Sequence, residues 1–392
     1  MADVPARQWL FVHEAMRDRV ALLEDAQLVE YYEESTIAPA LSGSIFWTIV
    51  RDVVPAIAAA FVDAGLPEKF FLQPGPESAP LHVGDRLAVQ VTRESSVGKA
   101  PRASLELDLP GHFLALLLDS DYVGVSRKIT EVEERERLQA LLTEQLQKAG
   151  APWPDLKLGA IARTLAQEAS AEDLRGEVEF LVERGAELMN QIACLRQTKS
   201  APQLLYAAPS LPERMVRDRV HSDDAVLTQG LDLRANGLRP PLQRPVLPPF
   251  AARSDAAATQ LSRNLFERFY VEELLQEAQL RTVTLPQGGS IVIDRCEALT
   301  AIDVNSGAST QAHTLEETAY HTNLEAARAA ARQIRLRNIG GIVIVDFIEM
   351  RSAAHHEKLM WLFDDELARD PARIHLLPLD EFGLAKLTRK KQ

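Results

Sequence analysis

The 392-residue sequence contains little of what marks a secreted, membrane-spanning or zinc-linked protein. It has two cysteines, Cys194 and Cys296, which stand far apart and form no Cys-x-x-Cys pair. A disulfide framework or a cysteine-based zinc site is therefore not expected, and the composition fits a reducing cytoplasm. The N-terminus lacks the apolar core of a signal peptide, and no run approaches the ~20 apolar residues of a membrane span.

Positive charge is also scarce, because 43 Lys and Arg residues face 56 Asp and Glu residues, for a net charge of −13. Proteins that bind nucleic acids usually carry a basic footprint, so this balance is unfavourable for such a partner. It does not exclude one, because binding depends on local charge and an acidic protein can present a basic groove. The 46% hydrophobic and 25% charged residues are typical of a soluble globular protein with more than one domain.

Hydropathy patterns predict a β-rich part followed by a helix-rich part. Residues 41–110 contain short apolar runs separated by Gly, Pro and Ser, which indicates strands. Residues 128–150 and 164–198 have a helical composition, and "LKLGAIART" between them predicts a strand. Five prolines within residues 240–249 predict an extended loop, which we interpret as a surface linker.

The last third of the chain predicts alternating helices and strands. Thr314, with Glu317 three residues later, matches a capping box that opens a helix. We expect helices over 264–280, from 314 to about 338–340, and over 352–369. We expect strands over 290–294, 298–304 and 373–379, and a buried strand in the apolar run "GIVIVDFIEM" (341–350).

Two of these expected strands carry an aspartate at or near their carboxyl ends. Asp303 follows the apolar run of "ALTAIDVNSG", and Asp346 follows Ile342–Val345. If the strands are neighbours, both carboxylates emerge at the same edge of the sheet, where open α/β sheets bind ligands. The side chains could instead cap the turns that follow the strands, and the residues alone leave both interpretations open.

Two nearby carboxylates repel each other unless a cation joins them. Mg²⁺ suits them because it takes oxygen ligands and is commonly held by one or two carboxylates together with substrate phosphates. Asn305 could orient a water molecule or a carboxylate in such a site. The metal could polarise a phosphodiester and supply an activated water, and Mn²⁺ could replace Mg²⁺.

The same residues resemble a known family. "EALTAIDVNSG" and "EETAYHTNLEAARAAARQIRLRNIGGIVIVDFIEM" resemble the catalytic core of the bacterial ribonuclease E/G family over residues 284–350. The resemblance implies Mg²⁺-dependent endonucleolytic cleavage of single-stranded RNA that leaves a 5′-phosphate and a 3′-hydroxyl. By this match Asp303 and Asp346 are the metal ligands, and Asn305 supports them.

Further upstream, "GSIFWTIVRDVVPAIAAAFVDAGLPEKFFL" resembles the S1 domain of the family, a five-stranded barrel related to the OB-fold. The match implies that Phe61 and Phe71 contact RNA bases and that Lys99 is a basic loop residue. Stacking of a base on an aromatic ring contributes about 1–3 kcal/mol and tolerates any base. Both phenylalanines could instead belong to the barrel core, and Phe70 could exchange roles with Phe71.

"YVGVSRKI" and "GAIART" resemble the two halves of the family's pocket for a 5′-monophosphate. The match implies that Gly124 and Val125 face Arg163 and Thr164 across this pocket. Arg163 offers a planar fork of donors to phosphate oxygens, and Thr164 offers a hydroxyl. Arg373 also aligns with an arginine of the family core, and we expect it to bind RNA near the active site.

Three departures from the family pattern stand out. The chain has no Cys-x-x-Cys zinc link, so no zinc site and no zinc-linked oligomer are expected, and a monomer or a small homo-oligomer is plausible. "GSIFWTIV" is less basic than the family's segment, and each lost phosphate contact weakens RNA binding. "ARTLAQEAS" lacks the glycine turn that usually follows Arg-Thr.

The resemblance implies an α/β multidomain fold. A discontinuous ribonuclease H-like subdomain (1–40 and 215–278) is interrupted by an S1-like barrel (41–110) and a 5′-sensor segment (111–214). A deoxyribonuclease I-like catalytic subdomain (279–392) follows. The leading hypothesis is an endoribonuclease, and the alternatives are an RNA-binding protein with weak or no cleavage and a phosphohydrolase whose substrate is not RNA.

Overall fold

The computed structural model describes residues 7–75, 78–95, 99–221, 223–231, 264–307, 314–380 and 382–391. These residues form a mixed α/β fold with four sheets and a closed five-stranded barrel within one of them. The predicted proline-rich linker lies outside the described residues. Within the described ranges, no helix has both the length and the apolar character needed to cross a lipid bilayer.

The first sheet has the strand order β14-β1-β2-β3. Its strands are β1 (Arg7–Glu14), β2 (Arg17–Glu24), β3 (Gln27–Ser35) and β14 (Ala225–Gln229). β14 pairs in parallel with β1 although about half of the chain separates them. Helix α3 (Leu211–Arg219) packs on one face, and α4 (Leu265–Arg268) and α5 (Val271–Gln279) pack on the other. Burial of both faces explains the unbroken apolar run Trp9–Val12.

The second sheet closes into a barrel with the order β4-β5-β6-β8-β7 and a further pairing of β4 with β7. The strands are β4 (Ile45–Val54), β5 (Ala59–Asp63), β6 (Phe70–Leu72), β7 (Arg86–Arg93) and β8 (Arg102–Ser104). β13 (Gln203–Tyr206) adds to β4. The closed barrel agrees with the expected S1 or OB-type architecture.

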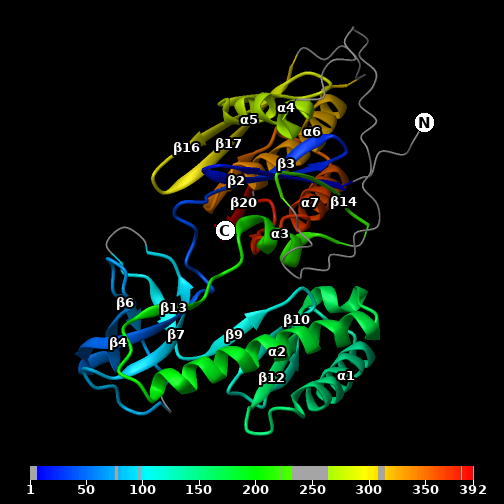
Figure 1. Ribbon diagram of the computed structural model, residues 1–392. Helices are drawn as coiled ribbons and strands as arrows, with labels where there is room; N and C mark the ends of the chain where they lie inside the picture. Colours follow the sequence, from blue (N-terminus) through cyan, green and yellow to red (C-terminus); the bar gives the residue numbers. More distant parts are fainter. Residues whose placement is uncertain are drawn as a thin grey trace.

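The third sheet has the order β11-β12-β10-β9, and two long helices pack against it. The strands are β9 (Leu107–Pro110), β10 (Leu114–Leu118), β11 (Val123–Val125) and β12 (Leu158–Ala162), and the helices are α1 (Val132–Gly150) and α2 (Ala171–Arg196). The second predicted helix begins later than residue 164, because Ser170 accepts a hydrogen bond from the Asp173 N–H and caps α2. α2 runs from the barrel to the third sheet (Figure 1).

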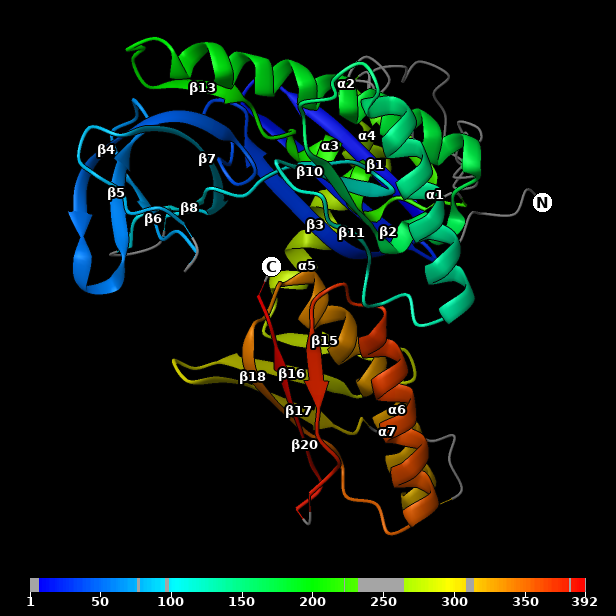
Figure 2. The same ribbon diagram turned by 90° about the horizontal axis from the view of Figure 1, so that it is seen from below.

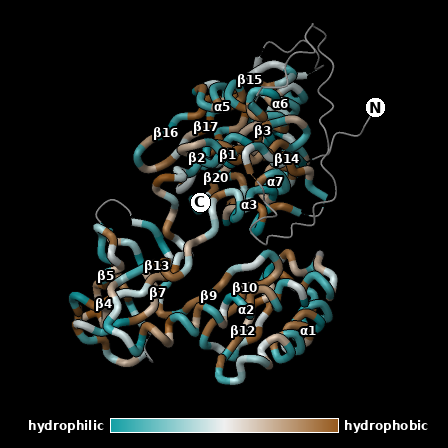
Figure 3. The backbone as a smooth tube through the Cα atoms, viewed as in Figure 1, coloured by the Kyte–Doolittle hydropathy of each residue, from teal (hydrophilic) through white to brown (hydrophobic). Residues whose placement is uncertain are grey.

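The fourth sheet has the order β15-β16-β17-β18-β20-β19. Its strands are β15 (Thr282–Thr284), β16 (Ser290–Arg295), β17 (Leu299–Asn305), β18 (Gly341–Asp346), β19 (Ile374–Leu376) and β20 (Leu384–Arg389). Helices α6 (Leu315–Leu336) and α7 (Ala353–Ala368) pack along one side of this sheet (Figure 2). The helices alternate between hydrophobic and hydrophilic residues, as expected when one face is buried (Figure 3).

Several predicted bounds are confirmed here, and two differ. Thr314 caps α6 by accepting a hydrogen bond from the Glu317 N–H at 3.1 Å. The helix expected over 264–280 is divided into α4 and α5 by Tyr270, whose φ of 54° is left-handed. The strand expected over 373–379 covers only Ile374–Leu376, and β20, which the sequence did not indicate, lies between it and β18.

Candidate functional site

Asp303 and Asp346 lie beside each other in the fourth sheet. β17 and β18 are parallel neighbours, and these two residues are direct partners in the register of the pair. The prediction that the two strands are neighbours is confirmed. Neighbouring strands are about 4.8 Å apart, and partnered residues project to the same face. The two carboxylates therefore leave the sheet side by side.

The alternation of buried and exposed residues sets the face on which they lie. Ile302 and Val304 of β17 are buried beneath α6 and α7, whereas Asp303 and Asn305 are exposed. Val345 of β18 is buried in the same way, and Asp346 is exposed. The pair thus occupies the face opposite the helices, with Asp346 as the last residue of β18 and Asp303 two residues before the end of β17.

Asn305 supports this pair directly. Its Nδ2 donates a hydrogen bond to Oδ2 of Asp303 at 2.8 Å, which orients that carboxylate and leaves its other oxygen available. Among the described residues, no lysine, arginine or histidine forms an ion pair with Asp303 or Asp346. The repulsion between the two carboxylates is therefore not relieved by a protein cation.

The donor set fits a small divalent cation. The described residues contain no group of three or more His, Cys, Asp or Glu that could hold a metal ion by themselves. Mg²⁺ does not require such a group, because it commonly uses one or two carboxylates and completes its octahedron with water and phosphate oxygens. Two adjacent carboxylates on an open face match this requirement.

A close contact between two glycines shapes the end of β17 that carries Asn305. A Cβ atom on Gly307 would lie 2.3 Å from the nitrogen of Gly289, and one on Gly289 would lie 2.6 Å from the Asn305 oxygen. Gly289 also has a φ of +95°, which side chains rarely adopt. A side chain at either position would therefore require the backbone at this end of β17 to shift.

The barrel places Phe61 and Phe71 together on its surface. They are partners across β5 and β6, and their rings meet edge to face with centroids 5.6 Å apart. Both side chains are only partly buried, whereas Phe70 is fully buried against Phe46. Phe70 is thus a core residue, and Phe71 is the one that remains accessible.

A basic residue that the sequence analysis did not predict lies beside these rings. Arg102 of β8 pairs with Phe71, and its guanidinium carbon lies 5.6 Å from the centroid of that ring. The only signal was its place in "KAPRAS", a few residues after Lys99. Lys99 itself is exposed. Arg102 and Phe71 together offer a stacking surface and a positive charge.

The two segments of the expected 5′-phosphate pocket also lie side by side. β11 pairs in parallel with β12, so Gly124 lies beside Ile161 and Val125 beside Ala162. The chain then continues into Ser126 on one side and into Arg163 and Thr164 on the other, with 3.2 Å between the Ser126 and Thr164 hydroxyls. A Cβ on Gly124 would lie 2.6 Å from the ring of Tyr122, so a larger residue there would require this exposed ring to move.

The Arg163 side chain already has two partners. It donates to the oxygen of Gly111 at 2.5 Å and to Oδ1 of Asp218 at 2.6 Å. Burial favours a higher pKa for Asp218, but Arg217 and Arg163 outweigh burial and hold this pKa below its usual value. Asp218 belongs to α3, so a distant part of the chain orients Arg163, and no local sequence pattern predicts this contact.

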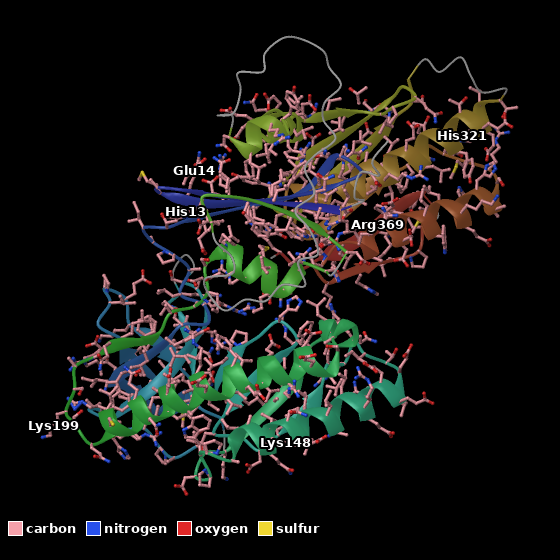
Figure 4. All side chains as sticks on the ribbon, turned by 45° about the vertical axis from the view of Figure 1, so that its right-hand side comes forward. His13, Glu14, Lys148, Lys199, His321 and Arg369 are labelled. Carbon is pink, nitrogen blue, oxygen red and sulfur yellow. The ribbon has the colours of Figure 1, made fainter. Side chains whose placement is uncertain are left out.

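Arg373 lies away from the aspartate pair. It follows α7, next to the end of the sheet where β18 begins, roughly 16 Å along that strand from Asp346. This position differs from the expectation that it lies near the active site. Arg373 lines a cavity of about 790 Å³. Six arginine and lysine side chains and three carboxylates line this cavity, so its charge is mainly positive. Arg369 of this cavity is labelled in Figure 4.

Comparison with known proteins agrees with this geometry. The model of the Ribonuclease E/G family matches residues 108–392, which is more than half of the chain. The chain belongs to the ribonuclease E/G family. The matched range includes both aspartates, Asn305 and the segments around Gly124 and Arg163.

Individual members of the family are similar over most of the chain. Ribonuclease G of Haemophilus influenzae is 30% identical over 402 residues, covering 95% of this chain and 77% of that protein. Ribonuclease G of Escherichia coli has the same identity and the same coverage. Ribonuclease E of Synechocystis is 34% identical over 365 residues, covering 89% of this chain and 52% of that protein. These alignments extend beyond the fourth sheet into the barrel.

Proposed function

We propose that this chain is a metal-dependent endoribonuclease that cleaves single-stranded RNA and leaves a 5′-phosphate and a 3′-hydroxyl. The observation that carries the proposal is the direct pairing of Asp303 with Asp346 on the open face of the fourth sheet. Membership in the ribonuclease E/G family supports RNA as the substrate. A bound Mg²⁺ would polarise the phosphodiester and lower the pKa of an attacking water.

The residues of the chain have separate roles in this proposal. Asp303 and Asp346 hold the cation, and Asn305 keeps the Asp303 carboxylate in the orientation that the cation requires. Phe61 and Phe71 stack on bases of the strand, with Arg102 and Lys99 close to its phosphates. Arg163, Thr164 and the backbone at Gly124 and Val125 receive a 5′-monophosphate. For Arg373 we propose a contact with RNA phosphates at the basic cavity.

We also propose that the expected subdomains apply. The pairing of β14 with β1 supports a discontinuous first subdomain that the barrel and the third sheet interrupt. The two-layer arrangement of the fourth sheet with α6 and α7 supports a deoxyribonuclease I-like catalytic subdomain.

The first test is cleavage of a fluorescent single-stranded RNA with a 5′-monophosphate, in Mg²⁺ and in EDTA. Asp303→Asn and Asp346→Asn should each lower the rate by at least 100-fold, because removal of one carboxylate removes half of the protein's ligands. Asp294→Asn is the matched control, because Asp294 lies on the neighbouring strand β16 and pairs with Arg281 instead. Its rate should stay within twofold of the wild-type rate.

The alternative is an RNA-binding protein with weak or no cleavage, and the aromatic pair of the barrel would suffice for it. Binding of the RNA by the wild type without cleavage in Mg²⁺ or Mn²⁺ would establish that alternative. Cleavage that continues in EDTA would contradict the metal-dependent mechanism.

A further inference from the structure

One side chain of α6 forms two hydrogen bonds with the loop that follows Asp346 at the end of β18. The N–H of Ile348 donates to Oδ1 of Asn323 at 2.9 Å, and Nδ2 of Asn323 donates to the Ile348 oxygen at 2.8 Å. A single amide therefore gives Ile348 both hydrogen bonds that a neighbouring strand would provide. Ile348 lies only two residues after Asp346.

The surroundings of Asn323 make these bonds obligatory. Its side chain is fully buried, and its neighbours in the core include Ala319, Ala326 and Ala327. A polar group in such a place destabilises the fold unless it is hydrogen-bonded. The described structure satisfies both Oδ1 and Nδ2 through Ile348.

The same helix bonds the loop a second time. Glu316 accepts hydrogen bonds from the N–H groups of Arg351 at 2.9 Å and Ser352 at 3.2 Å. The N–H of Arg351 is the main reason that the pKa of Glu316 lies below its usual value. The side chain of Phe347, between Asp346 and Ile348, is buried against Phe363 with ring centroids 5.7 Å apart.

The topology gives these contacts a consequence for both aspartates. α6 connects β17, which carries Asp303, to β18, which carries Asp346. Asn323 lies in the N-terminal half of α6, two residues after His321. Figure 4 shows His321 well away from Arg369, which follows the end of α7. The helix thus links the strand of one aspartate to the chain that follows the other.

We propose that Asn323 is a positioning residue for Asp346: its amide fixes Ile348 and so holds the Asp346 carboxylate opposite Asp303. This role rests on the proposed metal-dependent cleavage. Residues that orient metal ligands without touching the metal typically contribute 10–100-fold to metal affinity or activity. Loss of the amide should therefore weaken metal binding before it affects RNA binding, which involves other elements.

The test uses the full chain and the variant Asn323→Asp, which keeps the shape but replaces the Nδ2 donor with an oxygen facing the Ile348 carbonyl. Free Mn²⁺ is measured by electron paramagnetic resonance, and cleavage is measured over a range of Mg²⁺ concentrations. We expect the dissociation constant for Mn²⁺ and the half-saturating Mg²⁺ concentration to rise 10–100-fold. The KM for RNA and the rate at saturating Mg²⁺ should stay within a few-fold.

Ile334→Ala is the matched control. Ile334 is fully buried on the same helix and in the same core, eleven positions further along, and its truncation leaves a cavity without touching Ile348. The melting temperatures of all variants are measured, and this control should lose stability while it keeps the wild-type metal affinity. Asn323→Ser, which is smaller and polar, replaces the aspartate variant if that variant does not fold.

Each other result overturns the role. Wild-type Mn²⁺ affinity in Asn323→Asp, or equal weakening in Ile334→Ala, would show that Asn323 does not position the ligand. Failure of both Asn323 variants to fold, while Ile334→Ala folds, would assign it to stability alone. If Asp346→Asn binds Mn²⁺ as tightly as the wild type does, the proposed metal site itself is wrong, and the role fails with it.

Discussion

At the residue scale, Phe71 provides a sharp test of the barrel as an RNA-binding surface. Its ring is accessible, is flanked by Phe61 and lies beneath Arg102. Because base stacking contributes about 1–3 kcal/mol per base, Phe71→Ala should weaken binding of a single-stranded oligonucleotide by roughly 5–150-fold. Fluorescence anisotropy with poly-U and poly-A measures the effect, which should be similar for both sequences.

The third sheet offers a matched control for this substitution. Phe180 of α2 is also exposed, and Arg184 lies over its ring at 5.3 Å from the centroid. Phe180→Ala removes the same kind of aromatic–arginine pair on a helix that is not part of the barrel. Equal losses in the two variants would contradict a specific role for the barrel surface.

Single residues also show what a sequence can and cannot reveal. Asp303 and Asp346 could be paired from the sequence, because each follows an apolar run that predicts a strand. Arg102, Asp218 and Asn323 could not be found, since each acts through a partner far away in the chain. Their local sequences contain only an ordinary charged or polar residue, and burial and partners become visible only in the folded chain.

At the scale of elements, α2 stabilises the turn between β9 and β10. Glu177 accepts hydrogen bonds from three consecutive N–H groups, those of His112 at 2.5 Å, Phe113 at 2.8 Å and Leu114 at 3.0 Å. The same turn supplies the Gly111 oxygen that binds Arg163. The helix therefore supports the expected 5′-phosphate pocket through this turn.

Glu177→Ala should lower the free energy of unfolding by about 1–3 kcal/mol, because three N–H donors lose a charged acceptor. Chemical denaturation followed by circular dichroism measures this loss. Glu179→Ala, at an exposed position two residues further along the same helix, should change stability by less than about 0.5 kcal/mol. A loss no larger than that of the control would show that the turn holds its shape without Glu177.

Elements with strong local signals could be predicted, and those defined by distant pairing could not. α6 has a capping residue and a regular apolar face, so its start at Thr314 is visible in the sequence. The sequence does not indicate β20, yet this strand pairs with both β18 and β19. Arg389 of β20 is buried, and its Nε donates a hydrogen bond to Oδ2 of Asp370 at 2.7 Å. No local sequence pattern predicts this contact.

At the scale of the whole molecule, one buried glutamate joins three parts of the fold. Glu30 of β3 accepts hydrogen bonds from Arg219 of α3 at 2.7 Å and from Nε of Arg335 of α6 at 2.6 Å. Tyr32 donates a further hydrogen bond to it at 2.6 Å. The carboxylate therefore connects the first sheet and its covering helix to the C-terminal part that carries both aspartates.

Glu30→Gln should lower the free energy of unfolding by about 3–5 kcal/mol, because two arginines remain buried near the junction without their shared negative charge. Glu33→Gln on the same strand is the control, since Glu33 is exposed and its pair with Arg17 contributes at most about 1 kcal/mol. Thermal and chemical unfolding at neutral pH measure both variants. Equal effects would contradict a special role for the buried carboxylate.

The same junction predicts how stability depends on pH. Burial favours a higher pKa for Glu30, but Arg219 and Arg335 outweigh it and hold this pKa below its ordinary value. The charged carboxylate therefore stabilises the fold above the pKa of an unfolded glutamate, about 4.3, and this contribution is lost as the pH falls through the lower pKa of the folded state. The difference in melting temperature between the wild type and Glu30→Gln should accordingly be largest near pH 7 and shrink as the pH is lowered from 5 toward 3. A difference that stays constant over this range would show that the glutamate acts through its shape and hydrogen bonds rather than through its charge.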